Sequence, residues 1–195
     1  CMMMAFASCD RRRYRQLISD YAAWLCGTQL QNGMWSYDGQ GRGDNSNTQF
    51  AVLGLKAAID SGVALPPVVL RRIDAHFRHS QLRDGGWSYT QGGQATGSMT
   101  TAGLSALYIT GAMLAEPRKD CGQHVQDTSI ERGLEWISKN WSVQGNPGRG
   151  GQTWHYYYLY GIERVGVLSA LRRLGGHDWF REGAEFLLGS QQPNG

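Results

Sequence analysis

Three short polar runs hold most of the side chains that could do chemistry in this 195-residue chain. They are Asp44–Asn47, Thr96–Thr100 and Gln152–His155, and each leads into an apolar segment. We expect each run at the start of a helix, where unpaired amides and the positive end of the helix dipole favour an anion such as a diphosphate. Arg149 lies just before the third run and adds a positive charge. The polar residues expected to contact a ligand are Asn45, Ser46, Asn47, Ser98 and Arg149.

Aromatic residues accompany the same runs. Phe50 follows the first run, and Trp154, Tyr156 and Tyr157 lie within or just after the third. Their π-faces could line an apolar cavity and would suit an isoprenoid chain or a carbocation. Ordinary core packing would use the same side chains, so both interpretations stay open.

Two kinds of helical segment must position these residues. The first kind is amphipathic, with apolar stripes at helical spacing: Tyr14/Leu17/Tyr21/Trp24/Leu25, Val69/Ile73/His76/Phe77 and Ile130/Leu134/Ile137/Trp141. The second kind is apolar on nearly every side and covers Phe50–Ile59, Met99–Leu114 and Trp154–Leu171. Because a helix that is apolar all round must be buried all round, the two kinds predict an outer and an inner layer of helices. Strand signals are sparse, so we expect an all-α fold of stacked helical hairpins.

An internal repeat orders these segments along the chain. Gln29–Tyr37 aligns with Gln81–Tyr89 at an offset of 52 residues without a gap, and Gln, Leu, Gly, Trp, Ser and Tyr coincide. The same offset places Thr48 on Thr100. We expect one domain over 1–195, truncated at both ends, with repeats near 10–61, 66–114, 127–173 and 176–195.

The repeated pattern resembles the QW motif of the prenyltransferase and squalene (terpenoid) cyclase family. It reads aliphatic or aromatic-x3-Gln-x3-Gly-x-Trp, and begins at Leu25 and again at Phe77. The resemblance implies an α/α toroid of two concentric helix rings, here a partial ring of hairpins of about 52 residues. In that family the glutamine bonds backbone at a helix end and the tryptophan stacks on it. The residues to which the resemblance gives this structural role are Gln29, Trp35, Gln81, Trp87 and Gln191.

The family also offers a test for catalysis. Hopene-type cyclases carry Asp-x-Asp-Asp-Thr at the start of an inner helix, and the middle Asp protonates an alkene. Asp44–Thr48 overlays that segment, but Ser46 stands at the position of the acid and Asn47 at the third acid. Because a hydroxyl cannot protonate an alkene, we do not expect standard squalene protonation. The ordinary role for Asp44 is a helix N-cap.

Two hypotheses of function follow. In a toroid the inner helices run parallel and their N-termini gather at one rim, so the first hypothesis is an isoprenoid-binding, terpenoid cyclase-like or prenyltransferase-like protein with a central cavity. If it is an enzyme, the resemblance implies electrophilic isoprenoid chemistry with Asp44 and His155 as candidate proton-handling groups. The alternative is a non-catalytic helical-repeat module whose concave surface binds a peptide or partner protein.

Other partners find less support in the residues. The pairs His76/His79 and Cys121/His124 lack a convincing second pair of ligands, so we expect no metal and no other cofactor. Of 19 basic residues only three are Lys, and the clusters Arg11–Arg13, Arg71–Arg72 and Arg172–Arg173 are expected on solvated helix faces. Without a groove-reading motif they do not predict nucleic-acid binding. We expect a cytoplasmic location or contact with a membrane surface.

Overall fold

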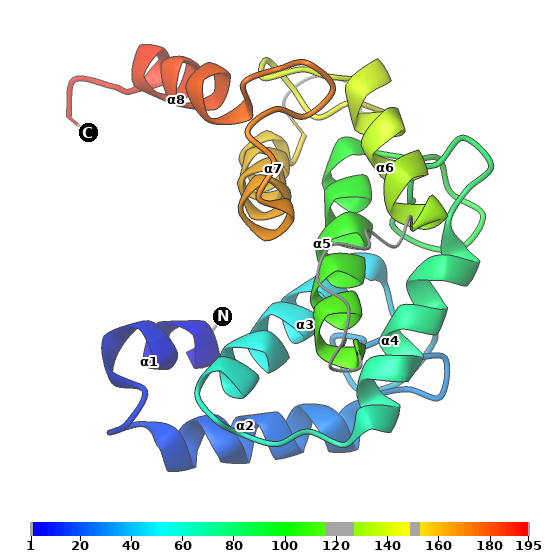
Figure 1. Cartoon of the computed structure of the whole chain (residues 1–195), viewed down its shortest axis with the longest axis vertical. Coiled ribbons are helices and arrows are strands. Elements are labelled where there is room, and N and C mark those ends of the chain that lie inside the picture. Colours follow the sequence, from blue (N-terminus) through cyan, green and yellow to red (C-terminus); the bar gives the residue numbers. More distant parts are fainter. Residues whose placement is uncertain (1, 116–126, 149–152, 195) are drawn as a thin grey trace, which may run out of the picture. The chain divides into compact units, whose positions relative to one another are not determined.

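The computed structural model describes residues 2–115, 127–148 and 153–194, and these fold into eight α-helices with no β-strand among them (Figure 1). The predicted all-α class is therefore confirmed. The helices are α1 (Met2–Asp10), α2 (Arg15–Thr28), α3 (Asn45–Asp60), α4 (Pro67–Ser80), α5 (Gly97–Leu114), α6 (Thr128–Lys139), α7 (His155–Ser169) and α8 (Trp179–Ser190). Within the described ranges, no helix has the length and apolar character needed to cross a bilayer.

The chain divides into two compact units. The N-terminal unit is Cys1–Ser80 with Ile109–Gln123, and the C-terminal unit is Gln81–Tyr108 with His124–Gly195. The first therefore holds α1 to α4 and the last residues of α5, and the second holds the rest of α5 with α6, α7 and α8. A single domain over 1–195 with four repeats stays a prediction.

The N-terminal unit contains one complete QW-type motif. The Gln29 side-chain amide donates to the carbonyl oxygens of Gly33 and Val69, both at 3.2 Å. The Trp35 backbone N–H donates to Thr48 Oγ1 at 3.2 Å. Because Val69 lies in the first turn of α4, Gln29 joins the loop after α2 to the start of α4, the next amphipathic helix along the chain.

The C-terminal unit contains the second motif, with the corresponding bonds. Gln81 Nε2 donates to the carbonyl oxygens of Gly85 and Ser129, both at 2.9 Å, and the Trp87 N–H donates to Thr100 Oγ1 at 3.2 Å. Ser129 lies in the first turn of α6. The last motif residue, Gln191, follows α8; its backbone N–H donates to Leu188 O at 3.4 Å and its side chain is exposed.

Two expectations about helix burial are wrong. In α2 the buried residues are Ile18 and Ala22, because α1 and α3 pack on that side, whereas Trp24 is 63% exposed. In α7, α8 covers one side and leaves Tyr156 63% and Val167 55% exposed, so this helix is not buried all round. By contrast, most of α3 is buried as expected.

Three expectations about helix ends are also wrong. Arg11–Arg13 lie in the turn after α1 rather than on a helix face, because the Asp10 carboxylate accepts the backbone N–H groups of Arg12 and Arg13. Arg172–Arg173 lie in the loop after α7, which ends at a left-handed residue, Ala170 (φ 54°). Trp141 lies beyond the end of α6, where the Asn140 side chain bonds Trp136 O at 2.8 Å.

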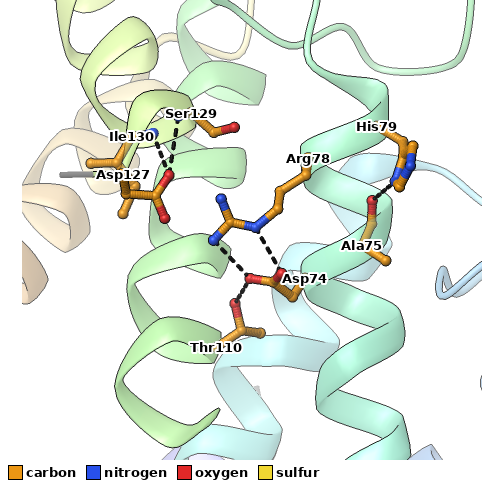
Figure 2. Close-up of polar contacts among 8 residues, drawn as sticks. All are labelled: Asp74, Ala75, Arg78, His79, Thr110, Asp127, Ser129 and Ile130. Carbon is orange, nitrogen blue, oxygen red and sulfur yellow. Dashed lines mark hydrogen bonds and ion pairs between the residues drawn. The ribbon is translucent and has the colours of Figure 1, made fainter. Parts of the chain in front are cut away.

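A buried polar contact ties α5 to α4 within the N-terminal unit. Thr110 is fully buried and donates its hydroxyl to Asp74 Oδ1 at 3.1 Å, while Arg78 donates to both oxygens of the same carboxylate (Figure 2). Thr110 thus gives the Asp74–Arg78 pair a partner from a second helix. In the C-terminal unit, Asp127 caps α6 through the N–H groups of Ser129 and Ile130 (Figure 2).

Candidate functional site

A cavity of about 320 Å³ opens between α1, α2 and α3 in the N-terminal unit, and we call it the aromatic pocket. Its aromatic lining residues are Tyr21, Trp24, Trp35, Tyr37 and Phe50. Its remaining lining residues are Met2, Met3, Leu25, Ser36, Asn47, Ala51 and Gly54. The volume lies at the lower end of the range of roughly 300–1,000 Å³ found for small-molecule sites, and the mostly apolar lining with few polar groups is typical of them.

Helical spacing places these side chains on one surface. In α3, Asn47, Phe50 and Gly54 follow one another at three- and four-residue intervals, and neighbours at such intervals share a helix face. Gly54 also allows α1 to approach closely, because a Cβ atom there would lie 2.7 Å from the Met3 terminal methyl carbon. A larger residue at position 54 would displace the end of the Met3 side chain, which lines the pocket.

The aromatic pocket has a buried wall and an exposed rim. Trp35 is 4% exposed and forms the wall, with its indole N–H donating to Leu25 O at 3.0 Å. Trp24 and Tyr37, at 63% and 83% exposed, stand at the rim. Large apolar groups that stay exposed at a pocket entrance are available to a ligand without unfolding any part of the chain.

Asp44 lies at the polar edge of this site and caps α3. It is 6% exposed, and its Oδ1 accepts the Asn47 backbone N–H at 2.8 Å while its Oδ2 accepts the Asn47 side-chain amide at 2.7 Å. The carboxylate is therefore the N-cap of α3, and it also orients the side chain of Asn47, which lines the pocket. Its role in proton transfer stays a prediction, as does the ligand role of Ser46, which is half-buried in the first turn of α3.

His76 belongs to the same region and was not among the expected site residues. Its Nε2 lies 2.7 Å from Asn45 Oδ1 and connects α4 to the first turn of α3. Burial, with a smaller effect from the nearby His79, lowers the pKa of His76 to about 4. The ring is therefore neutral at pH 7, and its Nε2–H donates to the amide oxygen of Asn45. Its place in an apolar stripe was the sequence signal for a buried histidine.

The other expected site residues lie in the C-terminal unit. His155 is 1% exposed, and its Nε2 donates to Val143 O at 2.9 Å. Ser98 is buried, and its backbone N–H donates to Asn146 Oδ1 at 2.9 Å. Trp154 is 66% exposed and Tyr157 is half-buried. Arg149 lies outside the described residues.

Tyr156 lines a second cavity, of about 390 Å³, between α7 and α8. Its other large lining side chains are Leu159, Tyr160, Ile162, Glu163, Trp179, Phe180 and Leu187. Glu163, the charged group in this lining, is paired with Arg164. Asn47 and Phe50 thus line a cavity of one unit, and Tyr156 lines a cavity of the other.

Metal coordination finds no support in the described parts of the chain, which hold no group of three or more His, Cys, Asp or Glu side chains able to share an ion. The Nε2 of His76 already bonds Asn45, and the Nδ1 of His79 donates to Ala75 O at 2.7 Å (Figure 2). Cys121 and His124 lie outside the described residues.

The lining of the aromatic pocket is chemically suited to an apolar molecule. Five aromatic rings supply contact area and π-faces, and Asn47 and Ser36 supply hydrogen-bonding groups. No family model, no curated protein and no solved structure matches this chain.

Proposed function

We propose that the chain binds an isoprenoid, or a ligand of similar apolar shape, in the aromatic pocket. The observation that carries the proposal is the ring of five aromatic side chains around a cavity with an exposed entrance. Two lining residues, Asn47 and Phe50, are among those expected from the sequence to contact such a ligand.

We infer further that the chain is built as part of an α/α toroid of the prenyltransferase and terpenoid cyclase type. Support comes from the two QW-type motifs, in which each glutamine bonds a carbonyl in the first turn of the next helix of the same kind. Support also comes from the order of the helices, since the largely buried α3 and α5 alternate with the amphipathic α4 and α6.

The proposal is one of binding and includes no proton transfer to an alkene. Ser46 stands where a cyclase of the hopene type needs its acid, and both oxygens of Asp44 are engaged by Asn47. His155 donates to a backbone carbonyl in a buried site.

Titration of the chain with farnesyl diphosphate, followed by NMR of the isoprenoid methyl groups, tests the proposal. At roughly 0.3 kcal/mol per non-hydrogen atom, a 15-carbon chain contributes about 4.5 kcal/mol, which corresponds to a Kd on the order of 0.5 mM. Trp24→Ala removes a rim side chain that is 63% exposed and should weaken binding about fivefold without unfolding the chain.

Trp154→Ala is the matched control, because Trp154 is 66% exposed and is not a lining residue of the aromatic pocket. We expect its Kd to stay within about twofold of the unaltered chain, and inorganic diphosphate not to compete, since the proposed contacts are with the hydrocarbon. Equal loss in the two variants, or no binding at 2 mM farnesyl diphosphate, would refute the proposal.

A non-catalytic binding module is the second candidate, and one observation favours it. α8 carries exposed apolar residues, with Phe180 68% and Leu188 72% exposed, which is a surface suited to a partner protein. This candidate predicts no affinity for farnesyl diphosphate, so the same titration separates the two.

A further inference from the structure

Aromatic side chains from both helices line the cavity of about 390 Å³ between α7 and α8, which we call the α7–α8 cavity. Tyr156 and Tyr160 come from α7, and Trp179 and Phe180 come from α8. The Trp179 and Phe180 rings lie almost at right angles, with an interplanar angle of 89° and centres 5.8 Å apart. Ring faces that point in different directions around one space are typical of sites that enclose an organic cation.

The Trp179 ring is fixed before any ligand arrives. Its indole N–H donates to Leu171 O at 2.8 Å. The ring also lies against Gly166 of α7, where a Cβ atom would overlap it. Because the ring is already oriented, a ligand loses little free energy in ordering this wall of the cavity.

The centre of the cavity is open because the residues there are small. Gly183 and Ala184 of α8 lie between Phe180 and Leu187, at three- and four-residue intervals that put them on the same helix face. Within the described ranges, a Cβ atom at Gly183 would meet no atom of another segment within 4 Å. The cavity therefore has room for the apolar part of a ligand.

The charge of the lining favours a cation over an anion. Its one charged side chain, among the described residues, is Glu163 of α7. Arg164 donates to both oxygens of this carboxylate, and its guanidinium carbon lies 5.5 Å from the centre of the Tyr160 ring, but Arg164 is not a lining residue. Each carboxylate oxygen has a second acceptor site, so Glu163 can still interact with a ligand. An anion in the cavity would face Glu163 with no cation in the lining.

We propose that the α7–α8 cavity binds an organic cation that carries an apolar chain, such as an alkylammonium ion. The positive group would lie against the aromatic rings near Glu163, and the chain would lie over Gly183. A quaternary ammonium group suits such a site because ring faces attract its charge and need no N–H donor from it. All lining residues belong to the C-terminal unit, so the proposal does not rest on ligand binding in the aromatic pocket.

Titration of the whole chain with octyltrimethylammonium, followed by NMR of the N-methyl signal, tests the proposal. We expect a Kd on the order of 1 mM, since the ligand has few non-hydrogen atoms. Octyl sulfate has the same chain and the opposite charge, and it should bind at least about tenfold more weakly because it meets Glu163. Far-UV circular dichroism at the highest ligand concentration checks that the helices remain folded.

Gly183→Leu should weaken binding about tenfold or more, because the new side chain occupies the space of the ligand. Gly189→Leu is the matched control, since Gly189 also lies in α8, has no atom of another described segment within 4 Å of its Cβ position and is not a lining residue. We expect the Kd of this control to stay within about twofold of the unaltered chain. Glu163→Gln keeps the shape of the side chain and removes its charge, so it should weaken binding about threefold to fivefold and reduce the preference over octyl sulfate.

Equal weakening by Gly183→Leu and Gly189→Leu would overturn the proposal, as would octyl sulfate binding as tightly as octyltrimethylammonium. Equal affinity for octan-1-ol would indicate an apolar cavity without preference for a cation, and would also overturn it. Trp24→Ala alters the aromatic pocket and should leave octyltrimethylammonium binding unchanged, whereas a loss equal to that of Gly183→Leu would place the cation in the aromatic pocket instead. Gly183→Leu should in turn leave the Kd for farnesyl diphosphate unchanged, so failure of this proposal and failure of the proposed function are distinguishable.

Discussion

The two QW-type motifs share one sequence pattern but differ in how firmly they hold the next helix. In the C-terminal unit, Arg132 of α6 donates to Gln81 Oε1 at 3.5 Å and to Leu82 O at 2.8 Å. In the N-terminal unit, the residue at the corresponding place in α4 is Arg72, which is exposed. Gln29 Oε1 is buried there and has no hydrogen-bond partner in the described part of the chain. The same motif is therefore a more complete clamp in the second unit.

The tryptophans differ in what surrounds them. Trp87 is fully buried and lies against Gly103 and Gly133, where Cβ atoms would come within 2.9 Å of its ring. The corresponding positions of the first motif hold Ala51 and Ile73. Trp35 instead borders the aromatic pocket together with Ala51. The second motif thus packs its tryptophan fully in a core, while the first has a cavity beside its tryptophan.

The largest expected effect on the free energy of unfolding comes from replacing either motif tryptophan, and the two single variants should differ. Trp87→Ala should cost about 4 kcal/mol, because it removes a fully buried ring from between two helices. Trp35→Ala should cost about 1–2 kcal/mol less, since part of its ring faces the pocket. Urea unfolding followed by circular dichroism measures both. A cost for Trp35→Ala equal to or above that for Trp87→Ala would contradict the comparison.

The motifs should also differ in acid sensitivity, because His76 of α4 corresponds to Trp136 of α6. With the pKa of His76 lowered to about 4 in the fold and near 6.5 when unfolded, the unfolded chain binds more protons between these values. Stability should therefore fall as the pH drops below about 6.5, by about 2 kcal/mol at pH 5.

Urea unfolding at pH 7 and pH 5 measures this loss, and His76→Gln should remove most of it. The comparison variant is His79→Gln, which changes an exposed histidine on the same helix; it should keep most of the loss, because burial has the larger effect on the pKa of His76 and His79 the smaller one. The same loss in His76→Gln as in the unaltered chain would assign the acid sensitivity to another group.

The smallest expected difference lies in the glutamines. Gln81→Ala removes two bonds of 2.9 Å and leaves Arg132 with one fewer acceptor, so we expect about 2 kcal/mol of destabilisation. Gln29→Ala removes two bonds of 3.2 Å but also an unpaired buried oxygen, so about 1 kcal/mol or less should be lost. Urea midpoints measure both losses. Adding Arg132→Ala to each variant should reduce the difference between the two losses, because Arg132 bonds Gln81. A larger loss for Gln29→Ala would reverse the interpretation.

Much of the helix pattern could be predicted from the sequence. Apolar stripes at helical spacing indicated the helices that became α2, α4 and α6, and continuous apolar segments indicated those that became α3, α5 and α7, because both patterns are local in the sequence. Asp44 was recognised as an N-cap from its place before a helix, and the Asp44–Asn47 bond bears this out. The pattern could not say which face of α2 is buried, since Ile18 and Trp24 are both apolar and only the packing of α1 and α3 distinguishes them.

The sequence by itself determined the helical class, the helix starts and the glutamine bonds to Gly33 and Gly85, because these depend on residues close together in the chain. Only the tertiary structure decided where the cavities lie and which polar side chains are buried. The aromatic pocket is lined by residues of α1, α2, α3 and the segment after α2, which meet only in the folded chain, and the pKa of His76 is lowered because folding buries it beside Asn45. Cavities and desolvation depend on atoms from distant segments, which no local pattern specifies.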